Sequence, residues 1–223
     1  MRYLSNIFNN LDWTVLLRAA AVLLCITVHE LSHGYVAYRL GDPTAKNMGR
    51  LTLNPIKHID IFGLLMLFLV GFGWAKAVPV DMRNFRSPKL GMAVTALAGP
   101  VSNMLLATLA LLVRAAIIPF YGGAVVDALI TFLELVAVIS IGLGLFNLIP
   151  IPPLDGSKIL FAFLSGEMYY KLMRYERYGF IILIALMYSG VTSNWISDGL
   201  GAVLGWLVDV TSFPYYIVSS LLR

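Results

Sequence analysis

The stretch Val28-His29-Glu30-Leu31-Ser32-His33-Gly34 determines how the rest of the sequence is interpreted. It contains the pattern H-E-x-x-H, and on a helix His29 and His33 project from one face because they are four residues apart. Two histidines at this spacing can bind a single zinc ion, with the adjacent glutamate as a general base. The pattern therefore predicts a helix that carries part of a zinc site.

The residues around this motif are apolar enough to cross a bilayer. Between Trp13 and Tyr38, the only charged side chain outside the motif is that of Arg18, and about 20 apolar residues are enough for a membrane span. Ionisable residues are costly to bury in a membrane, so His29, Glu30 and His33 are interpreted as functional. The alternative is that the two histidines only form hydrogen bonds with neighbouring groups.

The composition is typical of a polytopic membrane protein. Of the 223 residues, 59% are hydrophobic and 13% are charged, which is far from the balance of a soluble domain. The formal net charge of +4 does not indicate nucleic-acid binding, because the basic residues are spread over short loops between apolar segments. Cys25 is the only cysteine, so any metal site must be built from histidine and carboxylate.

The order of the apolar segments predicts an all-α polytopic membrane protein, a bundle of transmembrane helices. Apolar runs and the turn signals between them place spans at about residues 12–40, 90–118, 124–148 and, in a shorter form, 178–190. The tail 194–223 mixes tryptophan and aspartate with apolar residues. It is compatible with a span or with a helix on the membrane surface.

Three shorter segments predict structure at the membrane interface, near the motif. Residues 50–53 alternate in character, and Pro79 forbids a helix interior in residues 76–80, so the sequence predicts short membrane-associated β strands or a hairpin there. Residues 61–73 are apolar, but they are short and rich in glycine. They predict a dipping hairpin or a strongly tilted helix rather than a straight span.

The basic residues predict the orientation of the chain in the membrane. Most of the 16 basic residues fall in segments that this arrangement places on one side. Cytoplasmic loops carry an excess of lysine and arginine, so the side of the motif is expected to be cytoplasmic. The residues on this side are Arg39, Lys46, Arg50, Lys57, Lys76, Arg83, Arg86, Lys89, Lys158, Lys171, Arg174 and Arg177.

The motif supplies two ligands, whereas a catalytic zinc ion needs three protein ligands and an open position. Asp155 is the best candidate for the third, because it follows the helix-breaking run 150–153 and its span ends on the same side as His33. Gly156 would let the backbone turn toward the metal. Asp155 is alternatively a helix N-cap, and the two roles are compatible.

Three further polar residues have two open roles each. His58 is either an alternative zinc ligand or a structural histidine in an interfacial loop. Glu134 lies near the middle of its span, where it either lines a water path or pairs with a neighbour such as Arg114. Asn103 is either a residue that forms an interhelical hydrogen bond or a site residue.

Four motifs resemble those of the site-2 protease family of intramembrane zinc metalloproteases. The resemblance covers about residues 12–165, and the first and last motifs, each in an apolar span, are the most specific. In order, the motifs are His29-Glu30-Leu31-Ser32-His33, Leu53-Asn54-Pro55, Ala98-Gly99-Pro100-Val101-Ser102-Asn103 and Asn147-Leu148-Ile149-Pro150-Ile151-Pro152-Pro153-Leu154-Asp155-Gly156.

The resemblance implies roles for individual residues. It implies that His29, His33 and Asp155 bind one zinc ion (Zn2+) and that Glu30 activates the attacking water. It also implies that Asn147 lies near the site and steadies the substrate or the tetrahedral intermediate. Segments 50–53 and 76–80 would then offer a strand edge to an unwound substrate, or they are loops that pair only with each other.

The resemblance also implies the organisation and setting of the protein. We expect a single membrane-embedded metalloprotease domain over residues 1–223, with a core at 12–165 and C-terminal helices at 166–223, in a compact form without a PDZ or CBS domain. The expected partners are the lipid bilayer and a transmembrane protein substrate, without nucleic acid, and a homo-oligomer is compatible with the sequence. The protein is expected in a prokaryotic cell membrane, with its active site toward the cytoplasmic side.

Two functions of other classes remain open. A metal-binding transporter would hold an ion in transit with the same ligands, and a non-proteolytic relative would only bind membrane helices. Glu30 discriminates between the first alternative and a protease, because a protease needs it as a base while zinc stays bound. The second alternative is disfavoured because no residue of the zinc site is missing.

Overall fold

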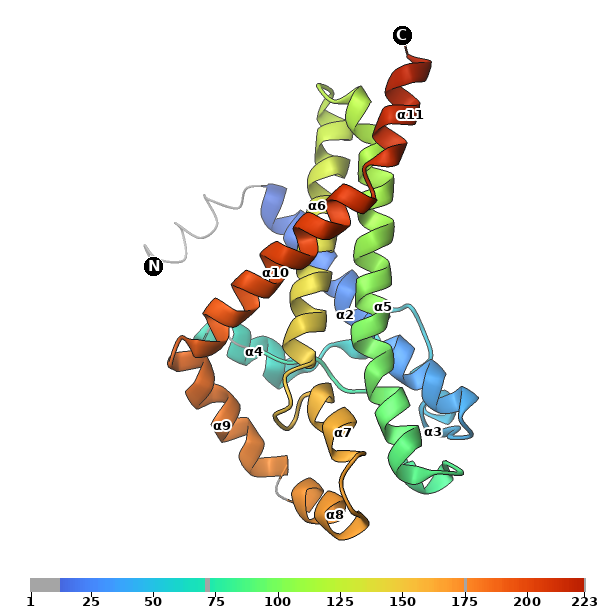
Figure 1. The fold of residues 1–223 in the computed structure, drawn as a ribbon, viewed down its shortest axis with the longest axis vertical. Helices are drawn as coiled ribbons and strands as arrows, with labels where there is room; N and C mark the ends of the chain where they lie inside the picture. The colour runs from blue at the N-terminus through green and yellow to red at the C-terminus, as the bar shows by residue number, and fades with distance from the viewer. Residues whose placement is uncertain (1–12, 71–72, 175, 223) are drawn as a thin grey trace.

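The computed structural model describes residues 13–70, 73–174 and 176–222, and helices dominate this part of the chain (Figure 1). The α-helices are α2 (Trp13–Arg39), α3 (Thr44–Asn47), α4 (Ile61–Val70), α5 (Pro88–Ile117), α6 (Ala124–Asn147), α7 (Asp155–Phe161), α8 (Gly166–Arg174), α9 (Glu176–Tyr188), α10 (Val191–Val210) and α11 (Phe213–Leu221). Three short 3-10 helices are η1 (Pro55–His58), η2 (Met82–Asn84) and η3 (Ile118–Phe120).

Four helical segments of the described chain are long and apolar enough to cross a membrane: Trp13–Arg39, Pro88–Phe120, Ala124–Asn147 and Asn194–Leu221. The first three confirm the long helices predicted from the sequence. The fourth comprises most of α10 together with α11, and it shows that the tail has the length and composition of a span. The predicted short span near residues 178–190 is the 13-residue helix α9, which is too short for a straight crossing.

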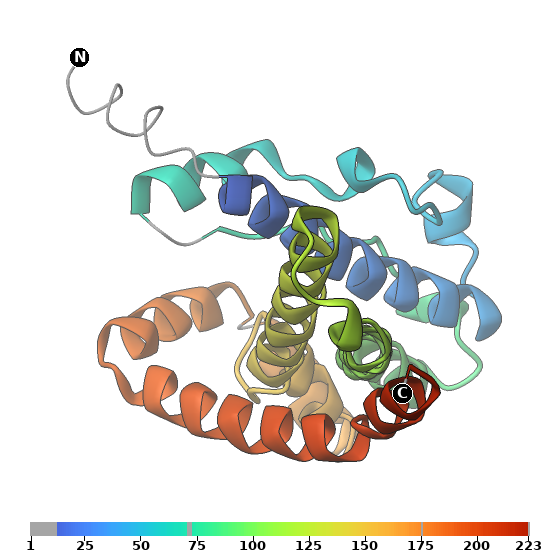
Figure 2. The ribbon, with the colours of Figure 1, turned by 90° about the horizontal axis from the view of Figure 1, so that it is seen from above.

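The core forms where α2, α5, α6 and α10 meet, and small residues allow these helices to approach closely. Helices α5 and α6 form a hairpin, and α10 crosses α6 on the side away from α2 (Figure 2). The fully buried residues at the centre of this core are Ala21 and Cys25 of α2, Ala107 of α5, and Ala137 and Ile141 of α6. This packing fixes α2 against α5, which the site below depends on.

The two ends of the bundle differ in composition. The turn between α5 and α6 lies at the same end as the C-terminus, whereas α3, α7 and α8 lie toward the opposite end (Figure 1). The loops and short helices that carry most of the basic residues are at this second end. The basic residues that the sequence predicts on one side are therefore concentrated at one end of the folded bundle.

The predicted strands are wrong for the described residues, where β structure is limited to an isolated antiparallel bridge between Ile59 and Ala75. Residues 50–53 bend back on themselves, because the Thr52 N–H donates to the carbonyl of Arg50 at 3.1 Å. Residues 76–80 are extended without a partner strand. Side chains bind their backbone groups instead: Arg50 donates to the Lys76 carbonyl at 2.7 Å, and Glu30 accepts from the Val78 N–H at 2.8 Å.

Of the two structures predicted for residues 61–73, a dipping hairpin or a tilted helix, the described part forms a helix too short for a straight span. Residues 61–70 form one short helix, α4, whose N-terminus is held by the Asp60 side chain, which accepts a hydrogen bond from the Gly63 N–H at 2.8 Å. Residues 71 and 72 lie outside the described residues. Because Gly63 packs closely against the backbone of Trp74, α4 lies beside the extended segment that follows it.

Candidate active site

The two histidines of the motif lie on the face of α2 that is buried against α5. His29 and His33 are 5% and 9% exposed, and their Nε2 atoms are 3.1 Å apart. Their rings meet edge to face, with centroids 4.6 Å apart. The spacing of four residues on one helix therefore brings two potential ligand atoms to one point, as predicted from the sequence.

Asp155 reaches the histidines because α6 ends and the chain turns back. Helix α6 stops at Asn147, and the proline-rich segment before Leu154 does not continue it. Gly156 lies against the end of α6, where a Cβ atom would be 2.2 Å from the Leu148 carbonyl oxygen. Asp155 is the first residue of α7, and the N-cap position is occupied by Leu154 instead. The capping role considered for Asp155 is therefore not observed.

The three potential ligand atoms form a nearly equilateral triangle. The Asp155 Oδ2 atom lies 3.2 Å from the His29 Nε2 atom and 3.1 Å from the His33 Nε2 atom. Ligand atoms about 2.0–2.1 Å from a tetrahedral zinc ion are separated by about 3.3 Å, so the triangle has the size that zinc requires. Three buried polar groups that converge on one point, two neutral and one anionic, fit a divalent cation.

Helix α5 supports this triangle through its backbone. The Nδ1 atom of His33 is 2.7 Å from the Thr95 carbonyl oxygen, and because a carbonyl can only accept, Nδ1 carries the proton. The Nε2 atom of neutral His33 then has a free lone pair for a metal, which is the arrangement that metal-binding histidines usually show. One turn further along α5, Gly99 faces the imidazole rings, and a Cβ atom there would be 2.5 Å from the His33 Nε2 atom.

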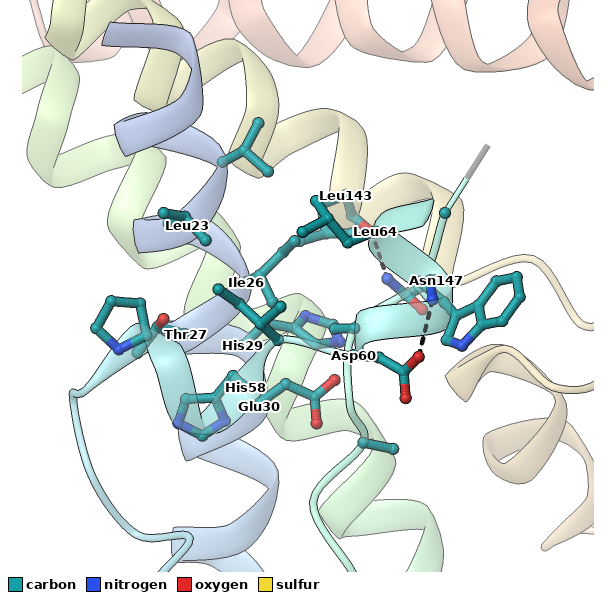
Figure 3. A pocket seen from close by; sticks show the side chains of 18 of the residues that line it. Leu23, Ile26, Thr27, His29, Glu30, His58, Asp60, Leu64, Leu143 and Asn147 are labelled. Atoms are coloured by element: carbon teal, nitrogen blue, oxygen red, sulfur yellow. Dashed lines mark hydrogen bonds between the residues drawn. The ribbon is translucent and has the colours of Figure 1, made fainter. Parts of the chain in front are cut away.

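Glu30 lies next to the triangle, in the wall of an apolar cavity of about 720 Å³. The cavity is bounded by α2, α4, the end of α6 and the extended segment after α4 (Figure 3). One oxygen of the Glu30 carboxylate, Oε2, accepts the hydrogen bond from the Val78 backbone N–H. The glutamate is thus held beside the metal-binding group, but it is not one of its three members.

Two other residues predicted to be near the site also line this cavity. Asn147 is the last residue of α6, and its side-chain amide donates to the Leu143 carbonyl at 2.9 Å (Figure 3). His58 is 1% exposed, and its Nε2 atom lies 2.9 Å from the Thr52 carbonyl oxygen. The structure thus places His58 outside the metal-binding triangle and gives it a structural contact in the loop.

Asn103 and Glu134 lie away from the cavity. Asn103 is fully buried on α5, near Gly144 of α6, and it is not among the described residues that line the cavity. Glu134 of α6 pairs with Arg114 of α5, with its Oε1 atom 2.6 Å from Nη2 of the guanidinium group. Of the two roles considered for Glu134, the structure supports the ion pair across the hairpin.

Sequence reasoning missed the functions of Thr95, Gly99 and Val78. Thr95 and Val78 contact the site residues through their backbones, so their side chains give no signal. Gly99 belongs to the Ala98-Gly99-Pro100 motif, which contributes to the family resemblance but predicts no role for the glycine. A glycine inside a long apolar helix indicates a close approach, but the sequence does not say to what.

The close approach at Gly99 leads to a prediction. Replacing Gly99 by alanine should push the imidazole rings of His29 and His33 out of the triangle, because the new methyl group would lie within about 2.5 Å of both rings. We expect zinc affinity to fall at least tenfold, as it does when the support of a metal ligand is disturbed. Gly142→Ala is the matched control, since a Cβ there on α6 meets no atom within 4 Å. Equal zinc content of the two purified variants after dialysis against a chelator would contradict this account of Gly99.

Comparisons with known proteins agree with this geometry. The sequence profile of peptidase family M50 matches residues 114–189. Two bacterial relatives are named as putative zinc metalloproteases. YwhC of Bacillus subtilis is 41% identical over 169 residues (74% of this chain and 77% of the relative), and Rip2 of Mycolicibacterium smegmatis is 31% identical over 211 residues (90% and 76%). No solved structure matches the chain.

These matches are long enough to assign the chain to a family. The alignment with YwhC covers more than two thirds of both proteins at 41% identity, and the buried His-His-Asp group is one that can hold the zinc of a metalloprotease. The apolar helices provide the membrane setting. On these grounds the chain belongs to peptidase family M50, the site-2 protease family of zinc metalloproteases.

Proposed function

We propose that this zinc metalloprotease is an endopeptidase that cleaves transmembrane segments of other membrane proteins, as in regulated intramembrane proteolysis. In this proposal His29, His33 and Asp155 bind one zinc ion, Glu30 is the general base, and Asn147 steadies the substrate or the tetrahedral intermediate. The observation that carries the proposal is that the buried His29-His33-Asp155 group adjoins an apolar cavity, whose wall includes His29 of that group together with Glu30 and Asn147.

The chemistry follows from what each side chain can do. When bound, zinc polarises the scissile carbonyl group and lowers the pKa of a water molecule. Glu30 takes the proton of that water and passes it to the leaving amine. Its Oε2 atom is held by the Val78 N–H, which leaves the second oxygen of the carboxylate for this transfer. Because His33 is oriented by the Thr95 carbonyl, the ligand set needs little rearrangement when the substrate binds.

The position of Glu30 favours a protease over a metal transporter. In a transporter, a carboxylate at this position would bind the ion or be dispensable. Here the Glu30 carboxylate is bound to a backbone N–H and lies beside the triangle, where it can act on a water molecule while all three ligands stay in place. The complete ligand set likewise disfavours a relative that only binds membrane helices.

The apolar lining of the cavity supports an apolar substrate. Its walls include Val22, Leu23, Ile26, Leu64, Leu143 and Phe146. A helical substrate must be unwound before its peptide bond can reach the metal, and each N–H or C=O group freed in the bilayer needs a partner. The sequence predicts that segment 76–80 offers a strand edge to the substrate. Fewer of its backbone groups are available for this pairing, because both backbone groups of Lys76 and the N–H of Val78 are already bound within the chain.

We further propose that residues 1–223 form one membrane-embedded domain whose active site lies toward the cytoplasm. The basic residues at the end of the bundle where α2 terminates support this orientation. Along α2, His33 and His29 lie about 9 Å and 15 Å before Arg39, at a rise of about 1.5 Å per residue. The catalytic group is therefore below the membrane surface, within the cytoplasmic half of the bilayer.

Mapping the cut in a reporter protein tests both the substrate class and the orientation. The reporter is a single transmembrane helix of known orientation with a folded domain at each end, co-expressed with the protease, and the product ends are read by mass spectrometry. We expect the cut within the cytoplasmic half of the apolar segment, and none with the Glu30→Gln variant. A cut in the opposite half would contradict the orientation, and cleavage confined to soluble loops would contradict the substrate class.

A further inference from the structure

A segment far from the motif in sequence holds the catalytic glutamate. Residues 76–84, here called the strap, run across α2 as an extended segment that ends in the short helix η2, and the Val78 N–H of the strap donates to the Glu30 Oε2 atom at 2.8 Å. The Val78 side chain is 8% exposed and packs at Gly34, where a Cβ atom would be 2.9 Å from its Cγ1 atom. The glycine after His33 therefore lets the strap backbone approach the helix closely enough for this hydrogen bond.

The first end of the strap is attached to the loop before α4. The Lys76 N–H donates to the His58 carbonyl at 2.9 Å, and the buried Arg50 side chain donates to the Lys76 carbonyl at 2.7 Å. These contacts leave the second end, residues 81–84, to be fixed separately. Without a second attachment, the strap could shift along α2 and carry the Val78 N–H away from Glu30.

The second end is held by a buried carboxylate, in addition to the packing of Val80 and Met82 against the cluster of Ala37, Phe85 and Met92. Asp42 follows the end of α2, nine residues after His33, and it is 0% exposed. Its Oδ2 atom accepts from the Asp81 N–H at 2.7 Å, and its Oδ1 atom accepts from the Asn84 side-chain amide at 2.7 Å and from the Thr44 N–H at 3.0 Å. The Thr44 hydroxyl also donates to Oδ1. One side chain thus joins the end of the motif helix to the end of the strap.

Only an ionised carboxylate can accept all of these bonds. Burial by itself would raise the pKa of Asp42, but the hydrogen bonds from Thr44, from the Asp81 backbone and from Asn84 hold it below its ordinary value. The partners are neutral donors rather than a cation. An asparagine of the same size would present an N–H2 group either to the Asp81 N–H or to the Asn84 and Thr44 donors, so it could not hold both Asp81 and Asn84 of the strap.

We propose that Asp42 is a positioning residue for catalysis, which acts through the strap to hold the Val78 N–H against Glu30. The inference rests on the proposed role of Glu30 as the general base. It assigns to Asp42, outside the metal-binding cavity, a role in the catalytic rate rather than in zinc binding. The expected loss is large because small displacements of a catalytic group, of the order of 1 Å, reduce rates by about 100-fold.

The test compares three variants for zinc content, kcat and KM on a purified reporter helix. Asp42→Asn should lower kcat by about 10- to 100-fold at one zinc per chain and an unchanged KM. Asn84→Ala removes one donor to Asp42 and should lower kcat by about fivefold. The matched control is Asp127→Asn at the far end of the bundle, where the side chain accepts a hydrogen bond from the Gly122 N–H. Its kcat should equal that of the wild type.

The double variant separates positioning from general stability. If Asp42 and Asn84 act through the same strap, Asp42→Asn with Asn84→Ala should be no slower than Asp42→Asn alone. If Asp42→Asn fails to fold, the kcat of Asn84→Ala alone tests the proposal. The proposal is overturned if kcat of Asn84→Ala equals that of Asp127→Asn, or if the losses appear only in zinc content or KM. Cleavage by zinc-loaded Glu30→Gln would instead overturn the role of Glu30 as the general base, on which this inference rests.

Discussion

Replacement of Asp155 by alanine is expected to lower the affinity for zinc by about 100-fold or more, since even the loss of a residue that supports a metal ligand costs up to that factor. Asp155 supplies the anionic member of the ligand triangle, and its Oδ2 atom faces both histidines at 3.1–3.2 Å. The variant leaves two imidazoles on α2, which cannot complete a catalytic zinc site. The measurement is zinc content by atomic absorption after dialysis against a series of chelators.

Asp127→Ala is the matched control for this experiment. Asp127 lies in the first turn of α6, where its side chain accepts a hydrogen bond from the Gly122 N–H at the far end of the bundle. The same chemical change there should leave the zinc content unaltered. If Asp155→Ala retains zinc as well as Asp127→Ala does, Asp155 is not the third ligand, and His58, which lines the adjoining cavity, becomes the candidate.

Replacement of Glu30 by glutamine is expected to abolish cleavage while one zinc per chain is retained. The amide oxygen of glutamine can still accept the hydrogen bond from the Val78 N–H, so the side chain stays in place. It cannot accept the proton of the attacking water, and the loss of a general base costs about 10²- to 10⁴-fold in rate. The rate is measured on the reporter helix, with zinc content determined on the same sample.

The two possible failures of this experiment have different meanings. Loss of zinc from Glu30→Gln would show that Glu30 is a ligand, which is the position expected in a metal transporter. Retention of both zinc and cleavage would show that another group takes the proton. The first result would contradict the assignment of the ligand set, and the second would contradict the assignment of the base alone.

The parts of the fold that could be predicted from the sequence are those that depend on local patterns. Helix α2 and the α5–α6 hairpin follow from long apolar runs, and the positions of their ends follow from glycine and proline. The placement of Asp155 near His33 was also predictable, because the proline-rich run fixes where α6 ends and topology returns the chain to the same side. Each of these inferences needs only a short stretch of sequence.

The strands were predicted wrongly because residues 50–53 turn locally, whereas residues 76–78 bind partly to side chains that lie far away in the sequence. Arg50 and Glu30 bind the backbone of residues 76–78, and neither contact has a signature in the alternation of apolar and polar residues. The same holds for the Thr95 carbonyl, which orients His33 across 62 positions. Likewise, no pattern in the sequence around Asp42 indicates that its carboxylate joins two segments of the fold.

A stoichiometric zinc titration of the metal-free protein, with cleavage of the reporter helix read at each point, tests the central claim most directly. The account predicts that cleavage is absent without zinc, rises in proportion to added zinc and stops rising at one zinc ion per chain, whereas Glu30→Gln binds the same single ion without cleavage. Cleavage by the metal-free protein, or a zinc ion that binds with equal affinity after replacement of His29, His33 and Asp155, would contradict it.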